Sequence, residues 1–284
     1  MRRDDEEKEP VVPTLSEEEK KTVIERTAPR AAVLHEAIRE EGEIELRRPV
    51  SALVWSGLAA GGSMGFSLAS EGLLQAYLPN APWRHLVVTL GYTVGFLAVV
   101  LGRQQLFTEN TVTVMLPLLS RRTVRALLQV LRLWAIVLAA NLLGACGFAW
   151  LVGNTGIFTP EVRAAFAEIG KAAATGAWEA IFLRAIFAGW IIAMMVWMLP
   201  STEGAGTAVI IIMTYLVGLG DFSHVVAGSV EVLYVVVTSG DISWAGYFGQ
   251  YLAPTLLGNV VGGVALVAFV NHAQVITEEA QSPQ

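Results

Sequence analysis

A short polar break inside a hydrophobic stretch constrains the fold of this chain more than any other feature. Residues Leu106 to Asn110 read Leu-Phe-Thr-Glu-Asn, and they separate an apolar run that begins near His85 from another that begins at Thr111. Inside a bilayer, backbone that leaves a helix is tolerated only where it is buried in protein or lines a cavity. A break of this kind is typical of a transport path.

The composition places the chain among polytopic membrane proteins. Hydrophobic residues make up 54% of it and charged residues 15%, and the mean hydropathy is +0.54, which lies outside the range of ordinary soluble domains. The single cysteine, Cys146, lies in an apolar run, which excludes a disulfide framework and a cysteine metal site. Nucleotide-binding glycine loops, metal-ligand clusters and nucleophile–base spacings are not found. We therefore expect no enzyme, no cofactor and no nucleic-acid partner.

Charge divides the chain into three regions. Residues 1–46 are predicted to form a charged cytosolic tail, which ends in a surface amphipathic helix around Arg30 to Glu41. The apolar stripe of that helix is expected to consist of Ala31, Val33, Leu34 and Ile38. Residues 47–272 form one membrane domain in this prediction, and residues 273–284 form a short acidic cytosolic tail.

Six membrane spans are predicted, because a spanning helix needs about 20 apolar residues. The second is interrupted at Gly102 to Asn110 and the fifth at Gly220 to His224. Residues Pro160 to Ala174 read as an interfacial amphipathic helix. The expected spans are, approximately, Pro49 to Leu78, His85 to Leu119, Ala126 to Val152, Trp178 to Leu199, Gly206 to Thr238 and Trp244 to Val270.

The two breaks fall on the middle span of each group of three. This is the pattern of an all-α inverted three-plus-three repeat whose half-helices meet near the bilayer midplane. Arg47 and Arg48 precede the first span, and Arg121, Arg122 and Arg125 follow the second. By the positive-inside rule, both termini are then cytoplasmic.

Several motifs resemble the formate/nitrite transporter family. They are Leu-Phe-Thr-Glu-Asn after Gly102, residues 188–198, residues 222–228 and above all residues 252–263, Leu-Ala-Pro-Thr-Leu-Leu-Gly-Asn-Val-Val-Gly-Gly. The resemblance covers roughly Arg30 to His272, and the charged N-terminal extension is similar to that of a less characterised branch. It implies an aquaporin-like protomer in a homopentamer of the bacterial inner membrane, each protomer with its own pore for small monovalent anions such as formate, nitrite or hydrosulfide.

The resemblance also assigns roles to single residues. Leu106, Phe107 and Thr108 match the family's gate in the second span, and His224 matches its central pore histidine. The same match puts further residues along the pore: Tyr92 and Phe96 at an apolar cytoplasmic-side constriction, Val217 on the other side, where the family tends to have a bulky aromatic, and, loosely, Lys171 near the outer vestibule.

His224 is the strongest candidate on physical grounds as well. A histidine within an apolar span is costly unless it serves a path or has a partner. It can donate a proton to a passing anion, or it can act only as a hydrogen-bond donor. Thr108 is its expected partner across the pore, since a hydroxyl rotates to suit either neighbour. Unpaired backbone N–H groups at the breaks would add to the attraction for an anion.

Departures from the family pattern leave the substrate open. Gly189 and Gly228 stand where the family usually has asparagine, and Arg103, Glu109 and Glu231 add charges at membrane depth. An unpaired charge there costs about 3 kcal/mol even on lenient scales, so we expect Arg103 to pair with Glu109 or Glu231. If Glu231 instead faces the pore, it favours a cation or a neutral solute.

Three functions therefore remain open. The first is a passive or proton-coupled channel for small monovalent anions. The second is a channel for a small neutral or weakly charged solute, and the third is a membrane scaffold or sensor that acts through its N-terminal tail.

Overall fold

The computed structural model describes residues 15–26 and 29–281, and this part contains helices and loops without any β-strand. It divides into two units, the second of which begins at Ala31. In the first unit, α1 (Glu17–Arg26) starts with a capping box: the Glu19 N–H donates to Ser16 Oγ at 3.3 Å, and the Ser16 N–H donates to the Glu19 carboxylate at 2.8 Å. The prediction for residues 1–14 lies outside the described residues.

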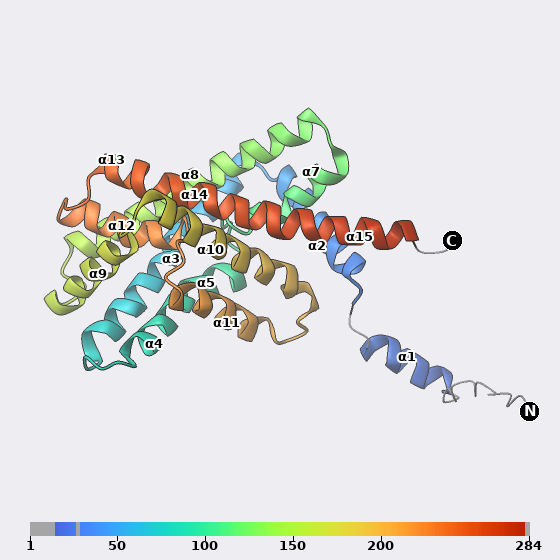
Figure 1. Cartoon of the computed structure of the whole chain (residues 1–284), viewed down its shortest axis with the longest axis horizontal. Coiled ribbons are helices and arrows are strands. Elements are labelled where there is room, and N and C mark those ends of the chain that lie inside the picture. The colour runs from blue at the N-terminus through green and yellow to red at the C-terminus, as the bar shows by residue number, and fades with distance from the viewer. Residues whose placement is uncertain (1–14, 27–28, 282–284) are drawn as a thin grey trace, which may run out of the picture. The chain divides into compact units, whose positions relative to one another are not determined.

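The second unit is a bundle of helices (Figure 1). In chain order its elements are α2 (Ala31–Arg47), α3 (Val50–Tyr77), α4 (Arg84–Val88), the 3₁₀ turn η1 (Thr89–Gly91), α5 (Tyr92–Leu101), α6 (Asn110–Thr113), α7 (Met115–Arg121), α8 (Val124–Asn154), α9 (Pro160–Ala173), α10 (Trp178–Met198), the 3₁₀ turn η2 (Leu199–Ser201), α11 (Gly206–Leu219), α12 (Ala227–Thr238), α13 (Trp244–Gly246), the π-helical η3 (Tyr247–Leu252), α14 (Ala253–Val260), the π-helical η4 (Val261–Phe269) and α15 (Val270–Gln281).

Five of the described helical stretches are long and apolar enough to cross a membrane. They are Val50–Tyr77, Arg84–Leu101, Val124–Asn154, Trp178–Ser201 and Trp244–Thr277. Between the last two lie α11 and α12, which are apolar but shorter. The helix ends and resumes where the sequence predicts breaks, between Leu101 and Asn110 and between Leu219 and Ala227. That one half is inverted relative to the other stays a prediction.

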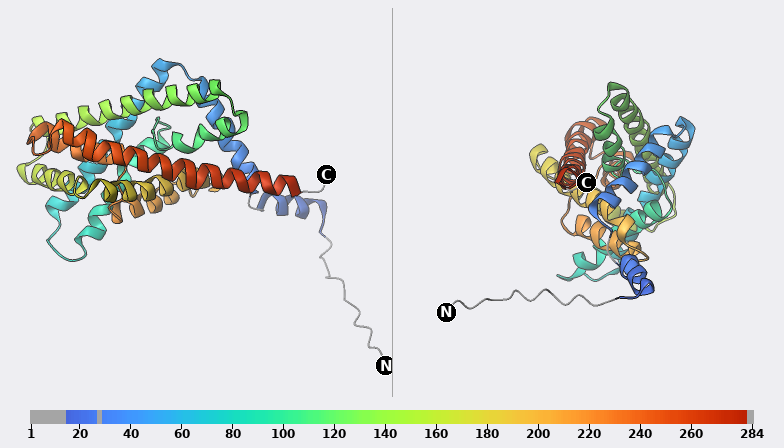
Figure 2. Two further views of the ribbon diagram at one scale, coloured as in Figure 1. Left: turned by 45° about the horizontal axis from the view of Figure 1, so that its top comes forward. Right: turned by 90° about the vertical axis from the view of Figure 1, so that its right-hand side faces the viewer.

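The helix before the first span buries or half-buries the predicted stripe, with one exception. In α2 the buried residues are His35, Ile38, Gly42 and Leu46, whereas Val33 of the predicted stripe is exposed. The buried face of α2 packs on α7 and α15. Figures 1 and 2 show α2 beside α15 at the same end of the bundle.

The last span does not end at Val270. Its helix continues through α15 to Gln281, so most of the predicted acidic tail is helical. A contact with α2 anchors the extension: the Nε2 atom of His35 lies 2.8 Å from Nδ1 of His272, and both rings are buried. The sequence offered no reason to pair these two histidines.

Two glycines allow the long helices to approach closely. A Cβ at Gly61 on α3 would overlap the backbone oxygen of Asn141 on α8, and a Cβ at Gly189 on α10 would overlap the backbone oxygen of Asn259 on α14. Gly189, which sequence comparison reads as a lost amide side chain, is therefore a packing position. Asn141 and Asn259, which these two glycines contact, are the residues that bind the two breaks.

Candidate functional site

The first break is held by Asn141, a buried residue of α8. Its Oδ1 accepts the Phe107 N–H at 2.9 Å, and its Nδ2 donates to the carbonyl oxygens of Gln105 at 2.8 Å and Gly57 at 2.9 Å. A side-chain amide thus replaces the helical partners that the backbone loses at the break.

The second break is held in the same way by Asn259 of α14. Its Oδ1 accepts the Val225 N–H at 2.8 Å, and its Nδ2 donates to the carbonyl oxygens of Ser223 at 2.9 Å and Ala185 at 2.8 Å. Each asparagine follows the amide that it binds by 34 residues and the carbonyl in the same break by 36. Superposing the two asparagines places Leu106 and His224 at matching positions.

The two helices that precede the breaks also end in the same way. Gly102, Arg103 and Gln104 donate their N–H groups to Ala98, Val100 and Val99, and the corresponding N–H groups of Gly220, Asp221 and Phe222 donate to Leu216, Gly218 and Val217. Arg103 and Asp221 are both left-handed, with φ of 53° and 48°. This turn terminates each half-helix and leaves opposite charges at the two matching positions.

Hydrogen bonds fix the tautomer of His224. Its Nδ1 accepts the N–H groups of Val226 at 3.3 Å and Ala227 at 3.1 Å. Nδ1 must therefore carry a lone pair, so the proton of the neutral ring is on Nε2. Nε2 lies 2.9 Å from Thr108 Oγ1 and donates to it. The Thr108 hydroxyl, as the acceptor, can direct its own hydrogen toward a third group.

The expected unpaired N–H groups are only partly present. Those that begin α12 are used, because Val226 and Ala227 donate to the His224 ring and Gly228 donates to the His224 carbonyl at 3.0 Å. In contrast, the N–H groups of Leu106 and His224 have no acceptor among the described residues. The breaks therefore leave one free donor at each of two matching positions.

An apolar layer surrounds this centre. Phe96 and Leu106 are fully buried, and the Phe96 ring meets the His224 ring edge-on with centroids 5.1 Å apart. Tyr92 extends the layer, its ring centroid lying 5.3 Å from that of Phe96. Phe107 packs instead against Trp134 of α8, at 5.7 Å.

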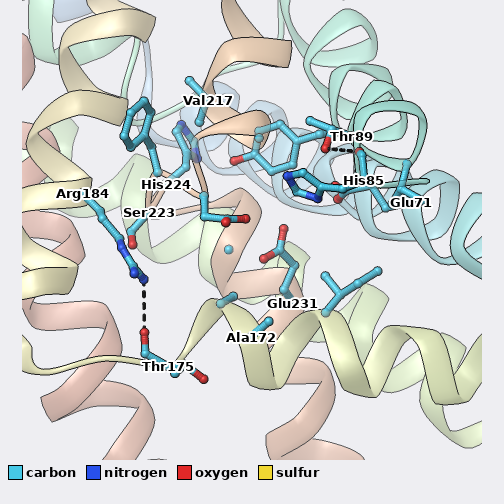
Figure 3. A pocket seen from close by; sticks show the side chains of 18 of the residues that line it. Glu71, His85, Thr89, Ala172, Thr175, Arg184, Val217, Ser223, His224 and Glu231 are labelled. Carbon is cyan, nitrogen blue, oxygen red and sulfur yellow. Dashed lines mark hydrogen bonds between the residues drawn. The ribbon is translucent and has the colours of Figure 1, made fainter. Parts of the chain in front are cut away.

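Two cavities lie on either side of the apolar layer. The His224 cavity, of about 490 Å³, is lined by residues of α3, α4, α9, α11 and α12 (Figure 3). The Glu109 cavity, of about 340 Å³, is lined by residues of α2 and of the first break, among them Glu41, Arg103 and Glu109. Phe96, Leu106 and Thr108 line neither.

Tyr92 and Val217 line the same cavity, together with His224. The prediction that they lie on opposite sides of the pore is therefore wrong. The reason is that α11 packs beside η1 and α5, so both residues reach the same cavity. Phe96, one turn further along, reaches the apolar layer.

The charged residues of the first break have other partners than predicted. Arg103 is largely exposed and forms an ion pair with Glu41 of α2, with 2.7 Å between Nη2 and Oε1. It pairs with neither Glu109 nor Glu231, because its left-handed backbone turns the side chain toward α2. Glu109 is half-buried, and its buried Oε1 atom has no hydrogen-bond partner among the described atoms.

Lys171 does not line the His224 cavity. Its Nζ lies 2.7 Å from Oδ2 of Asp241, and both side chains are about half exposed. The hydrogen bond from Lys171 lowers the pKa of Asp241. The lysine is therefore committed to an exposed ion pair rather than directed at the cavity.

Glu231 does line the His224 cavity, and a second buried glutamate, Glu71 of α3, lines it as well. Sequence reasoning missed Glu71, although a glutamate within an apolar span is itself a signal. It also missed Asn141 and Asn259, each a polar residue in an apolar helix. Gly228 turns out to face the Tyr251 hydroxyl, which fills the space that a side chain would need.

Comparison with known proteins decides the family. The model of the formate/nitrite transporter family matches residues 32–273. The chain belongs to this family. The chain is 45% identical to the inner membrane protein YfdC of Escherichia coli K12, over 88% of this chain and 81% of that protein. It is 28% identical to the formate channel BtFdhC of Bacillus thuringiensis, over 84% and 92%.

Solved structures agree with the fold of this family member. An ion channel of the family matches with a TM-score of 0.70 and 19% identity, covering 86% of this chain and 98% of that one. A pentameric formate channel with formate bound matches with a TM-score of 0.66 and 17% identity, covering 80% and 98%. The chain is thus a multi-pass membrane protein with a transporter fold, and these neighbours are channels rather than enzymes.

Proposed function

We propose that this formate/nitrite transporter conducts small monovalent weak-acid anions, in the class of formate, nitrite and hydrosulfide, through a pore in each protomer of a homopentamer. The relatives named as formate channels support the substrate class, and the pentameric neighbour supports the assembly. With both termini cytoplasmic, the Glu109 cavity opens to the cytoplasm and the His224 cavity to the outside.

One observation carries this proposal: a hydrogen-bond donor with a fixed direction lies in an apolar layer between two cavities. His224 donates from Nε2 to Thr108 Oγ1, and this leaves the Thr108 hydroxyl hydrogen for an anion. Phe96 and Leu106 exclude water around that donor. Donors are worth more in such a low-dielectric layer than in water. The anion or its conjugate acid is held there by hydrogen bonds without a buried cation.

A flux assay on purified protein in liposomes tests the proposal. We expect the wild type to carry formate, nitrite or hydrosulfide faster than chloride, and Thr108→Val to lose at least about half of that flux. Thr108→Ser keeps the hydroxyl and is the matched control, with flux near that of the wild type. Absence of flux for all four anions in the wild type would reject the proposal.

A second function has its own support. Glu71 and Glu231 line the wider cavity, and two carboxylates there would repel an anion, as the sequence suggests for a channel that carries a neutral or weakly charged solute. Glycerol and urea flux in the same liposomes distinguishes the two. Flux of these solutes with none of the anions would favour the second function.

A further inference from the structure

Two buried glutamates from different helices face one cavity. Glu71 on α3 and Glu231 on α12 are 8% and 7% exposed, and both line the His224 cavity. Figure 3 shows the Glu231 carboxylate directed into the cavity, with His224 and Ser223 on its far side. The two carboxyl groups are close enough to interact electrostatically with each other and with Asp221.

Neither glutamate is compensated by a cation. The ion pairs of the described residues include neither of them, and Glu71 Oε2 has no hydrogen-bond partner there. Arg184 is the arginine of the lining, but it is exposed and its Nη1 donates to the Thr175 carbonyl at 3.2 Å. Burying a carboxylate without a cation or a donor is costly, so a carboxyl in this position is held most cheaply with a proton on it.

The other titratable groups of the cavity do not serve this role. Glu168 of α9 is exposed and accepts a hydrogen bond from Gln75 at 2.7 Å, and Asp221 is exposed at the end of α11. His85 of the lining is exposed, and Tyr92 and Tyr251 carry phenols, which are weaker acids than a carboxyl group. The two glutamates are the buried carboxylic acids of this lining.

His224 is also unsuited to supply a proton. Its Nδ1 accepts two backbone N–H groups, and a proton on Nδ1 would face both donors and break both bonds. The Nε2 proton is held by Thr108. A proton that meets an anion on the way to the apolar layer must come from another group.

We propose that Glu71 and Glu231 form a proton-binding carboxyl pair that protonates the entering weak-acid anion. This rests on the proposed function. The O–H bond of one carboxylic acid breaks, and a new O–H bond, or an S–H bond for hydrosulfide, forms on the anion. The neutral acid crosses the apolar layer past Thr108, and the carboxylate left behind takes a proton from water in the cavity.

Transport by glutamine variants tests this proposal. The variants are Glu71→Gln, Glu231→Gln and the double variant, with Glu168→Gln as the control because it removes an exposed carboxyl from the same cavity. We expect the double variant to lose roughly tenfold or more of its formate flux, in line with loss of a general acid. We also expect it to lose the rise of flux with falling external pH and the proton uptake that accompanies formate.

Chloride flux provides the internal reference, because chloride is not protonated by a carboxylic acid. The formate-to-chloride ratio should therefore fall in the double variant and stay unchanged in Glu168→Gln. A double variant with the wild-type ratio and pH profile would overturn the proposal. A wild type that carries ammonium, and loses that flux in the variants, would overturn it in favour of a cation site.

A second measurement does not depend on transport. The infrared C=O stretch of a protonated carboxyl should be present in the wild type at neutral pH and reduced in each glutamine variant that remains pentameric by size-exclusion chromatography. Anion flux without such a band rejects the proton pair but not the channel. The band without flux of any anion rejects the proposed function and leaves the proton site in place.

Discussion

The two breaks in the membrane helices share their backbone conformation at the helix end and their asparagine contacts, but they carry different side chains at matching positions. Each begins with a left-handed residue, and each is clamped by one asparagine that makes two hydrogen bonds to the break and a third to a neighbouring helix. At matching positions, however, the first break carries Arg103 and Leu106, while the second carries Asp221 and His224.

This difference distinguishes the asparagines, which stabilise the backbone of the breaks, from the side chains of the breaks, which determine their function. The asparagine clamps satisfy the backbone, so the side chains between them are free to vary. Leu106 supplies part of an apolar barrier, and His224 supplies a directed donor. The charges at the helix ends differ likewise, since Arg103 pairs with α2 beside one cavity and Asp221 lines the other.

The largest expected effect comes from removing a clamp. Asn141→Leu and Asn259→Leu each remove three buried hydrogen bonds and leave their backbone partners unsatisfied, at about 1–3 kcal/mol per group. We expect both variants to unfold at a lower temperature than the wild type in detergent. Asn154→Leu, which removes an exposed bond on the same helix as Asn141, should unfold like the wild type. Loss of stability in only one clamp variant would contradict the equivalence of the breaks.

The second-largest effect is expected at the glycines that pack against the two asparagines. Gly61→Ala and Gly189→Ala push a methyl group into the backbone of the facing helix, and overpacking costs about 1–3 kcal/mol. We expect a lower thermal midpoint for both. Gly62→Ala, on the same helix with open space around its Cβ position, should be neutral or stabilising. If Gly61→Ala behaves like Gly62→Ala, the close approach is not needed.

Replacing His224 with leucine, the residue at the matching position of the first break, should remove the hydrogen-bond donor from the second break. In His224→Leu, Thr108 loses its donor and the Val226 and Ala227 N–H groups lose their acceptor. We expect anion flux in liposomes to fall roughly tenfold, the equivalent of about 1.4 kcal/mol. His224→Gln, which keeps both an N–H and an acceptor, should recover part of it. Equal flux in His224→Leu and the wild type would show that the donor is dispensable.

The smallest effect is expected at the ion pair beside the first break. Arg103→Gln and Glu41→Gln remove a pair that is largely exposed on the arginine side, and such pairs contribute about 0–1 kcal/mol. A double-mutant cycle on the free energy of unfolding should give a coupling within that range. A larger coupling would mean that α2 depends on Arg103 for its position.

Sequence reasoning located both breaks and the central residues, because a polar interruption of an apolar run is a local signal. It brought Thr108 and His224 together correctly, and the structure places them 2.9 Å apart. It failed for the placement of Tyr92 and Val217 and for the partner of Arg103. In each case the outcome depends on a neighbouring helix that periodicity along one helix does not reveal.

The sequence by itself determined the membrane class, the positions of the helices and the two places where they break. These follow from hydropathy and from polar residues at set positions, which act through the local backbone. Only the tertiary structure decided what the residues of the breaks do. Asn141, Asn259 and Glu71 lie far along the chain from the breaks that they clamp or the cavity that they line, so their roles come from helix packing that no local pattern encodes.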